Sequence, residues 1–190
     1  MKEGNAVIAL FGSGSAKEGG RLYETARELG RLLGKCGFSL CNGGYGGVME
    51  ASARGVRRVD GNVMGVALEK ADWGEPNRWL TEVQYCEDMA QRTMSLIRQA
   101  DACVVMPGGT GTLAELSWLL ELIGKGHIQP RPVVFLGDFW MPLVELMQDE
   151  SVFRQSSTCT EVDGINIMGM AARAETPEAT VRFLKENVLE

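Results

Sequence analysis

The stretch ACVVMPGGTGTLAE, from Ala102 to Glu115, is the part of the sequence that decides the fold we predict. It opens with a short apolar run, which is typical of a strand covered on both faces of a parallel sheet. A glycine-rich turn follows, and the residues after it, Thr112–Ile123, carry apolar side chains at helical spacing. A buried strand, a glycine turn and a helix in this order form the repeating unit of α/β proteins.

The same order of strand, turn and helix recurs along most of the chain. Strands are predicted at Ala6–Phe11, Phe38–Cys41, Asn62–Leu68, Leu80–Cys86, Ala102–Met106 and Pro132–Leu136. Helices are predicted at Arg21–Leu33, Val48–Val59, Asp88–Gln99 and Thr112–Ile123, near Leu143–Met147, and from Thr176 onward. We therefore predict an α/β fold, with a parallel sheet flanked by helices on both faces, in a single domain over residues 1–190. The polar segment Asp149–Gly164 has no regular pattern, and no element is assigned to it.

Three glycine turns each follow a predicted strand, and they contain the candidate binding residues. They are GSGS at 12–15, GGYGG at 43–47 and GGTGT at 108–112. Ligands of parallel sheets bind at the carboxyl ends of strands, and glycines let main-chain amides converge there without obstruction. A helix that starts after such a turn points free amides and partial positive charge at it, which suits a phosphate group. The alternative is a tight turn whose glycines serve packing alone.

Two charged residues next to these turns are candidates for chemistry. Glu115 lies near the start of the predicted helix, where the helix dipole favours a carboxylate, so we expect it to be ionised at neutral pH. It either complements the dipole or stabilises positive charge on a sugar ring and orients a water. Arg92 either forms a solvated ion pair with Asp88 four residues earlier or binds phosphate. The single histidine, His127, is expected in an exposed loop without a catalytic role.

Composition and charge limit the class of protein. Hydrophobic residues make up 45% and charged residues 23% of the chain, as in globular proteins, and the net charge of −6 argues against a nucleic-acid-binding surface. The five cysteines show no CxxC spacing, which favours a reducing cytoplasm and, with one histidine, no zinc site. We expect no signal peptide and no membrane span, because no apolar stretch approaches about 20 residues.

Three motifs resemble the LOG (Lonely Guy) family. They are GGYGGVME at Gly43–Glu50, MAQR at Met89–Arg92 and PGGTGTLAE at Pro107–Glu115, and the likeness in order and spacing covers about residues 6–147. The resemblance implies a Rossmann-like domain that forms a homodimer or a higher homo-oligomer. It also implies hydrolysis of the N-glycosidic bond of nucleoside 5′-monophosphates to a free base and ribose 5-phosphate, without a cofactor or a metal.

Carried over residue by residue, the resemblance assigns the site. Arg92 and Glu115 match the catalytic arginine and glutamate of the family. The residues that match its glycine motifs are Gly43, Gly44, Gly46, Gly47, Gly108, Gly109, Thr110, Gly111 and Thr112. Gly12 and Ser13, from the first glycine turn, are added as nucleotide-binding candidates. Glu50 and Met89 are added as residues expected to line the pocket.

Two departures from the family pattern support a second hypothesis. Thr93 follows the arginine where cytokinin-activating members usually have lysine, and Glu50 stands where they usually have glycine. GGxxGVMEA is more similar to a branch that includes molybdenum-cofactor carriers, which bind a phosphate-bearing pterin. The alternative is thus a non-catalytic protein that binds a nucleotide or the molybdenum cofactor.

Two further hypotheses concern surfaces around the site. The segment Trp73–Trp79 is predicted to be a loop that either covers the pocket or packs on the surface. On the helix after the third turn, Trp118 and Leu122 are expected on a face that is free for dimer formation, with burial elsewhere in the chain as the alternative.

Overall fold

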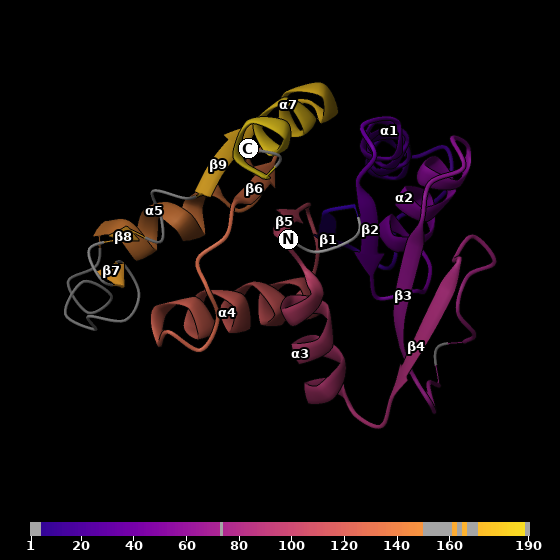
Figure 1. The fold of residues 1–190 in the computed structure, drawn as a ribbon, viewed down its shortest axis with the longest axis horizontal. Coiled ribbons are helices and arrows are strands. Elements are labelled where there is room, and N and C mark those ends of the chain that lie inside the picture. The colour runs from indigo at the N-terminus through magenta and orange to yellow at the C-terminus, as the bar shows by residue number, and fades with distance from the viewer. Residues whose placement is uncertain (1–4, 73, 150–160, 163–164, 167–170, 189–190) are drawn as a thin grey trace.

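The computed structural model describes residues 5–72, 74–149, 161–162, 165–166 and 171–188 (Figure 1). Seven parallel strands form one sheet in the order β4-β3-β2-β1-β5-β6-β9. They are β1 (Val7–Phe11), β2 (Ser39–Asn42), β3 (Val63–Leu68), β4 (Glu82–Cys86), β5 (Ala102–Val105), β6 (Val133–Leu136) and β9 (Ala171–Ala174). A separate antiparallel pair consists of β7 (Glu161–Val162) and β8 (Ile165–Asn166).

Helices cover both faces of the seven-stranded sheet. They are α1 (Arg21–Lys35), α2 (Val48–Arg57), α3 (Met89–Gln99), α4 (Thr110–Gly124), α5 (Met141–Asp149) and α7 (Pro177–Val188). Buried side chains of α1, α2 and α7 pack on one face, and those of α3, α4 and α5 pack on the other. In Figure 1, α1 and α7 lie above the strands, and α3 and α4 lie below them. The prediction of a parallel Rossmann-like sheet flanked by helices is confirmed.

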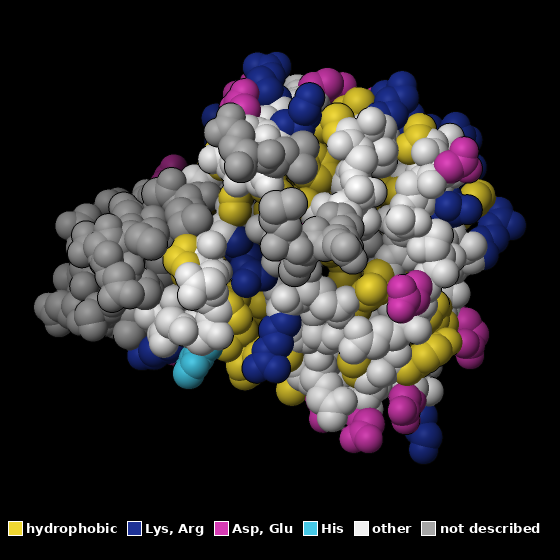
Figure 2. Space-filling view, viewed as in Figure 1, with side chains coloured by type: hydrophobic (Ala, Val, Ile, Leu, Met, Phe, Trp, Pro, Cys, Tyr) yellow, Lys and Arg dark blue, Asp and Glu magenta, His cyan; other side chains and the backbone are white. Residues whose placement is uncertain are grey.

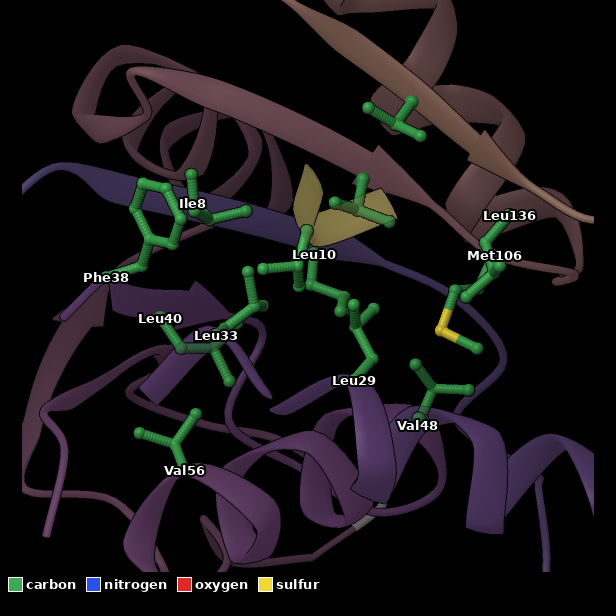
Figure 3. Packing of buried hydrophobic residues seen from close by; sticks show 14 of the residues in the cluster. Ile8, Leu10, Leu29, Leu33, Phe38, Leu40, Val48, Val56, Met106 and Leu136 are labelled. Atoms are coloured by element: carbon green, nitrogen blue, oxygen red, sulfur yellow. The ribbon is translucent and has the colours of Figure 1, made fainter. Parts of the chain in front are cut away.

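The core forms because successive side chains of each strand point to opposite faces of the sheet. On β1, Ile8 and Leu10 join the cluster under α1 and α2, whereas Ala9 and Phe11 join the cluster under α3 and α4. All four are at most 1% exposed. Figure 3 shows Leu29 and Leu33 of α1 pointing toward β1, which carries Ile8 and Leu10. Two buried faces explain why the strands read as continuous apolar runs.

The order of the strands creates a crevice at the carboxyl ends of the central strands. From β1 the chain builds outward through β2 and β3 to β4, and it then returns to place β5 on the other side of β1. Such a reversal of strand order opens a crevice beyond the carboxyl ends of the central strands. The turns after β1, β2 and β5 are the three glycine turns noted in the sequence. The fold therefore gathers them at one edge.

Three expectations need correction. Helix α4 begins at Thr110, two residues before the predicted start at Thr112. Leu122 is 6% exposed and belongs to the core, because it lies one helical turn from the buried Leu119; of the two residues expected on a free face, only Trp118 is exposed. Strand β9 was not predicted, because its sequence AARA has neither β-branched nor aromatic residues.

Much of the unassigned segment Asp149–Gly164 lies outside the described residues. Within the part of the chain that the structure describes, no helix is both long and apolar enough to cross a bilayer.

Candidate functional site

A cavity of about 530 Å³ lies at the carboxyl ends of the central strands. It is lined by Leu10, Gly12, Ser13, Gly14, Ser15, Gly43, Tyr45, Gly46, Met49, Arg92, Gly109, Thr110, Gly111, Thr112 and Glu115. All three glycine turns contribute to this wall, and so do both candidate catalytic residues. The volume is in the range of pockets that bind small molecules, about 300 to 1,000 Å³.

The structure does not bring every predicted residue to the cavity. Gly44, Gly47 and Gly108 belong to the turns but do not line it. Glu50 and Met89, which were expected in the pocket, do not line it either. Glu50 is turned about 100° around α2 from Met49, which does reach the cavity, and Met89 is 46% exposed at the start of α3. The cavity also has lining residues that were not among the assigned site residues: Gly14, Ser15 and Tyr45 within the quoted turns, and Leu10 and Met49 next to them.

The first turn of α4 presents main-chain donors to the cavity. No side chain caps the helix at Gly109, and the first bond of the helix runs from the Leu113 amide to the Gly109 carbonyl. The amides of Thr110, Gly111 and Thr112 therefore have no acceptor within the helix. With the partial positive charge of the helix start, they form a cradle suited to an oxyanion.

The glycines of this turn serve two different purposes. A Cβ on Gly108 would overlap the Thr112 hydroxyl, so packing requires glycine there. A Cβ on Gly109 or Gly111 would meet nothing within 4 Å, and neither residue has a positive φ. Neither packing nor backbone conformation within the protein thus requires glycine at these two positions. The room above them is part of the cavity, where a bound group can approach the main chain closely.

Ser13 connects the three turns through its main chain. Its amide donates to the Pro107 carbonyl at 3.0 Å, and its carbonyl accepts from the Val48 amide at 2.9 Å. The hydroxyls of Ser13 and Ser15 lie 2.9 Å apart on the loop that follows β1. A Cβ on Gly12 would come within 2.7 Å of Val48, so the loop can lie against α2 only with glycine there. These contacts hold the turns in one rigid frame.

The side chain of Asn42 holds the turn after β2 by hydrogen bonds to the main chain. This side chain is fully buried, its Oδ1 accepts from the Gly44 amide at 2.9 Å, and its Nδ2 donates to the Met49 carbonyl at 2.9 Å. Gly44 and Gly47 have φ of 80° and 66°, which favour glycine. The signal in the sequence for Asn42 was a polar residue at the end of an apolar strand, directly before the glycines.

Arg92 is buried and already hydrogen-bonded. Its side chain is 7% exposed, with Nε donating to the Val66 carbonyl at 2.8 Å and Nη2 donating to the Gly43 carbonyl at 3.1 Å. Nη1 lies 3.9 Å from Glu115 Oε1. Asp88 instead caps α3 by accepting from the Gln91 amide, so the alternative of a solvated Asp88–Arg92 ion pair is wrong. The guanidinium is therefore positioned at the cavity wall by the protein itself.

Glu115 differs from the expectation of an ordinary ionised carboxylate. Since α4 begins at Thr110, Glu115 lies beyond the first turn, where the effect of the helix dipole has fallen off. Burial raises the pKa of Glu115 to about 7, and the positive charge of Arg92 opposes this shift only in part. The side chain is 15% exposed. Near neutral pH both protonation states are populated, which suits a group that takes part in acid–base chemistry.

The remaining candidates lie away from the cavity. His127 is exposed after α4, and Figure 2 shows the single histidine at the surface. Trp73 is outside the described residues, whereas Trp79 packs against the core on the side of α2. Among the residues that the structure describes, no three His, Cys, Asp or Glu side chains gather in a metal-binding arrangement.

Comparison with known proteins places this chain in a family. The family described as "possible lysine decarboxylase" matches residues 49–176. An uncharacterized protein of Archaeoglobus fulgidus is 32% identical over 130 residues, which are 68% of this chain and 82% of that protein. A rice protein, named probable cytokinin riboside 5′-monophosphate phosphoribohydrolase LOGL2, is 30% identical over 161 residues, which are 80% of this chain and 64% of the rice protein.

A solved structure shares the fold over nearly its whole length. It is that of the molybdenum cofactor carrier protein from Chlamydomonas reinhardtii, with a TM-score of 0.73, 19% identity, and coverage of 98% of this chain and 99% of the other. At this identity the likeness concerns the fold alone. The match to the family over most of the chain and the level of identity to its relatives lead to one conclusion: the chain belongs to the LOG family, whose members also carry the description "possible lysine decarboxylase".

Proposed function

We propose that this protein is a nucleoside 5′-monophosphate phosphoribohydrolase, which cleaves the N-glycosidic bond to release a free base and ribose 5-phosphate. One observation carries the proposal. The cavity that contains the uncapped amides of α4 also contains Glu115, whose pKa is raised to about 7 beside the buried Arg92. An anion cradle and a carboxylate that titrates near neutral pH are the two parts that this reaction needs.

The 5′-phosphate binds at the start of α4. The amides of Thr110, Gly111 and Thr112 donate to its oxygens, and the open space above Gly109 and Gly111 admits it. The threonine hydroxyls offer further donors. Binding the phosphate, which does not react, orients the ribose for the step at C1′.

Glu115 acts at the sugar in its ionised form. As the bond between C1′ and the base nitrogen breaks, positive charge develops on the ribose ring, and a carboxylate stabilises it. The electron pair leaves with the base, which takes up a proton from solvent. A water oriented by Glu115 adds to C1′ and gives a proton to the Glu115 carboxylate, which returns it to solvent, so the hydrolysis consumes one water with no net change in protons. Arg92, whose Nη1 lies 3.9 Å from Glu115 Oε1, helps to position the carboxylate. It also contributes a hydrogen-bond donor to the phosphate or the sugar.

The relatives support this assignment. The rice protein is named as a probable phosphoribohydrolase of a nucleoside 5′-monophosphate, and this chain spans 64% of its length. The cytokinin specificity in that name is not part of the proposal, since Thr93 and Glu50 depart from the usual pattern of cytokinin-activating members.

We also propose that the protein is a cytoplasmic homodimer or higher homo-oligomer, with the exposed Trp118 at the contact between subunits. Native mass spectrometry would test the number of subunits.

Hydrolysis of AMP, GMP, CMP and UMP, followed by chromatography of the free base, tests the proposal. We expect release from at least one of them and at least about a hundredfold loss in Glu115→Gln, with binding of the monophosphate retained. If all four bind and none releases its base, the protein is not a phosphoribohydrolase of common nucleotides.

The shared fold of the molybdenum cofactor carrier favours a second candidate, a carrier of a phosphorylated pterin. In that function the same cradle holds the phosphate, and Glu115 shapes the pocket without chemistry. Protein purified without denaturation would then retain a fluorescent pterin or molybdenum. A preparation with neither, which also binds neither when they are added, rejects the carrier.

A further inference from the structure

In the described part of the loop between β3 and β4, Asn77 is hydrogen-bonded to the turn that forms one wall of the cavity. Its main-chain amide donates to the Gly44 carbonyl at 2.7 Å, and its Nδ2 donates to the carbonyls of Gly44 and Tyr45, each at 2.9 Å. Its Oδ1 accepts from the Trp79 amide at 3.0 Å. Both ends of the amide group are therefore engaged, and this sets the orientation of the side chain.

These bonds determine how two peptide groups of the glycine turn are oriented. The described chain has no cis peptide bond, so each N–H points away from the carbonyl of the same peptide group. With the carbonyls of Gly44 and Tyr45 directed at Asn77, the amides of Tyr45 and Gly46 face the opposite side. Tyr45 and Gly46 line the cavity, whereas Asn77 does not. Asn77 thus acts on the wall from outside.

The same turn holds the arginine of the site. The Gly43 carbonyl accepts from Arg92 Nη2, and the Arg92 guanidinium carbon lies 5.6 Å from the centre of the Tyr45 ring. A Cβ on Gly43 would overlap this guanidinium, which shows how closely the two fit. Any shift of the turn therefore changes the position of Arg92, and with it the charge next to Glu115.

We propose that Asn77 is a positioning residue, which sets the Gly43–Gly46 wall and, through the Gly43 carbonyl, places Arg92 against Glu115. The proposal rests on the proposed function only in its effect on turnover. The arrangement of Arg92 and Glu115 can be tested separately, through the pKa of Glu115. None of the hydrogen bonds of Asn77 reaches the start of α4, so we expect the phosphate cradle to stay intact when Asn77 is changed.

The variants separate the side-chain hydrogen bonds of Asn77 from other effects of changing the loop. Asn77→Ala removes the side-chain bonds, and Asn77→Asp keeps the size and the acceptor for the Trp79 amide but loses the two Nδ2 donor bonds. The Asp variant also serves if the Ala variant folds poorly. Arg78→Ala is the matched control, because Arg78 is the next residue and stacks on Trp79 at 4.8 Å without contacting the turn. Thermal melting establishes that each variant is folded.

The first measurement is a carbon-13 NMR titration of the Glu115 carboxyl in ligand-free protein. We expect a higher pKa in both Asn77 variants, because Arg92 moves away from the carboxylate, and no change in Arg78→Ala. The second is calorimetric binding of AMP and of inorganic phosphate. We expect AMP to bind at least about tenfold more weakly to both Asn77 variants, and phosphate to change by less than about twofold.

The outcomes separate the two proposals. An unchanged pKa of Glu115 in both variants, or equal weakening of AMP and phosphate, overturns the role of Asn77. If the wild-type protein releases no base but the pKa of Glu115 rises as expected, Asn77 positions Arg92 and the hydrolase assignment is what fails.

Discussion

Two of the three glycine turns at the cavity, at 43–47 after β2 and at 108–112 after β5, are similar in composition but differ in how they are built. In the first turn, Asn42, Asn77 and Arg92 bond to the main chain, and Gly44 and Gly47 have positive φ. In the second, three amides lack a partner within the helix, and two glycines have open space where a side chain would be. We therefore call the first the supporting turn, and the second, which we propose binds the phosphate, the receptor turn.

The difference shows that glycine content does not by itself identify a binding turn. Glycine is needed in the first turn because other atoms and the backbone conformation exclude a side chain. In the second turn, a Cβ on Gly109 or Gly111 would meet nothing within 4 Å, which agrees with the proposed phosphate site. Substitutions that add one methyl group to each turn therefore test this difference.

The largest effect is expected for Gly47→Ala in the supporting turn. The residue has φ of 66°, and an added Cβ would overlap the Ser13 carbonyl and the Gly14 main chain, which cannot move without disturbing the loop. We expect the free energy of unfolding to fall by about 4 kcal/mol, from urea denaturation. A loss below about 1 kcal/mol would mean that this turn is not constrained as described.

The next effect concerns Glu115 and pH. Between pH 4.5 and about 7 the folded protein keeps a proton on Glu115 that the unfolded chain has lost, so stability from this group falls as the pH rises through that window. The difference in unfolding free energy between wild type and Glu115→Gln should change by about 3 kcal/mol over this range and then level off. Parallel curves for the two proteins would show that Glu115 titrates normally.

A third prediction tests the receptor turn through Gly111→Ala. The methyl group fills the open space above the start of α4, so we expect the dissociation constant of inorganic phosphate to rise by about tenfold or more. Stability should be unchanged or higher by about 0.5 kcal/mol, because alanine favours the helix. Calorimetric titration and urea denaturation measure the two quantities. Equal phosphate binding in both proteins would place the anion elsewhere.

The smallest effect is expected away from both turns, at the cap of α3. Asp88→Ala removes the acceptor for the Gln91 amide and should cost about 1 kcal/mol in urea denaturation. Because Arg92 is held by carbonyls of β3 and of the turn after β2, binding of AMP should not change. Weaker AMP binding would instead support the ion pair between Asp88 and Arg92 that the structure does not show.

The parts of the fold that could be predicted from the sequence are those with a clear local pattern of apolar residues. Apolar runs and helical spacing located the elements from β1 to α5, because each pattern is set by neighbouring residues. Strand β9 was missed, since a short edge strand of alanines and one arginine has no local signal. In the site, both charged candidates and most of the motif glycines line the cavity, whereas Gly44, Gly47, Gly108, Glu50 and Met89 do not. The sequence did not single out Tyr45, Met49, Asn42 and Asn77, because their roles depend on contacts between distant segments.

Local patterns in the chain were enough to locate three glycine turns after three strands of an α/β sheet, with an arginine and a glutamate beside them. The environment of these two residues comes from the tertiary structure. Burial raises the pKa of Glu115, and the positive charge of Arg92, which lies 23 residues earlier in the chain, opposes this shift in part. Desolvation depends on which segments close around a group, and no local pattern in the chain contains that information.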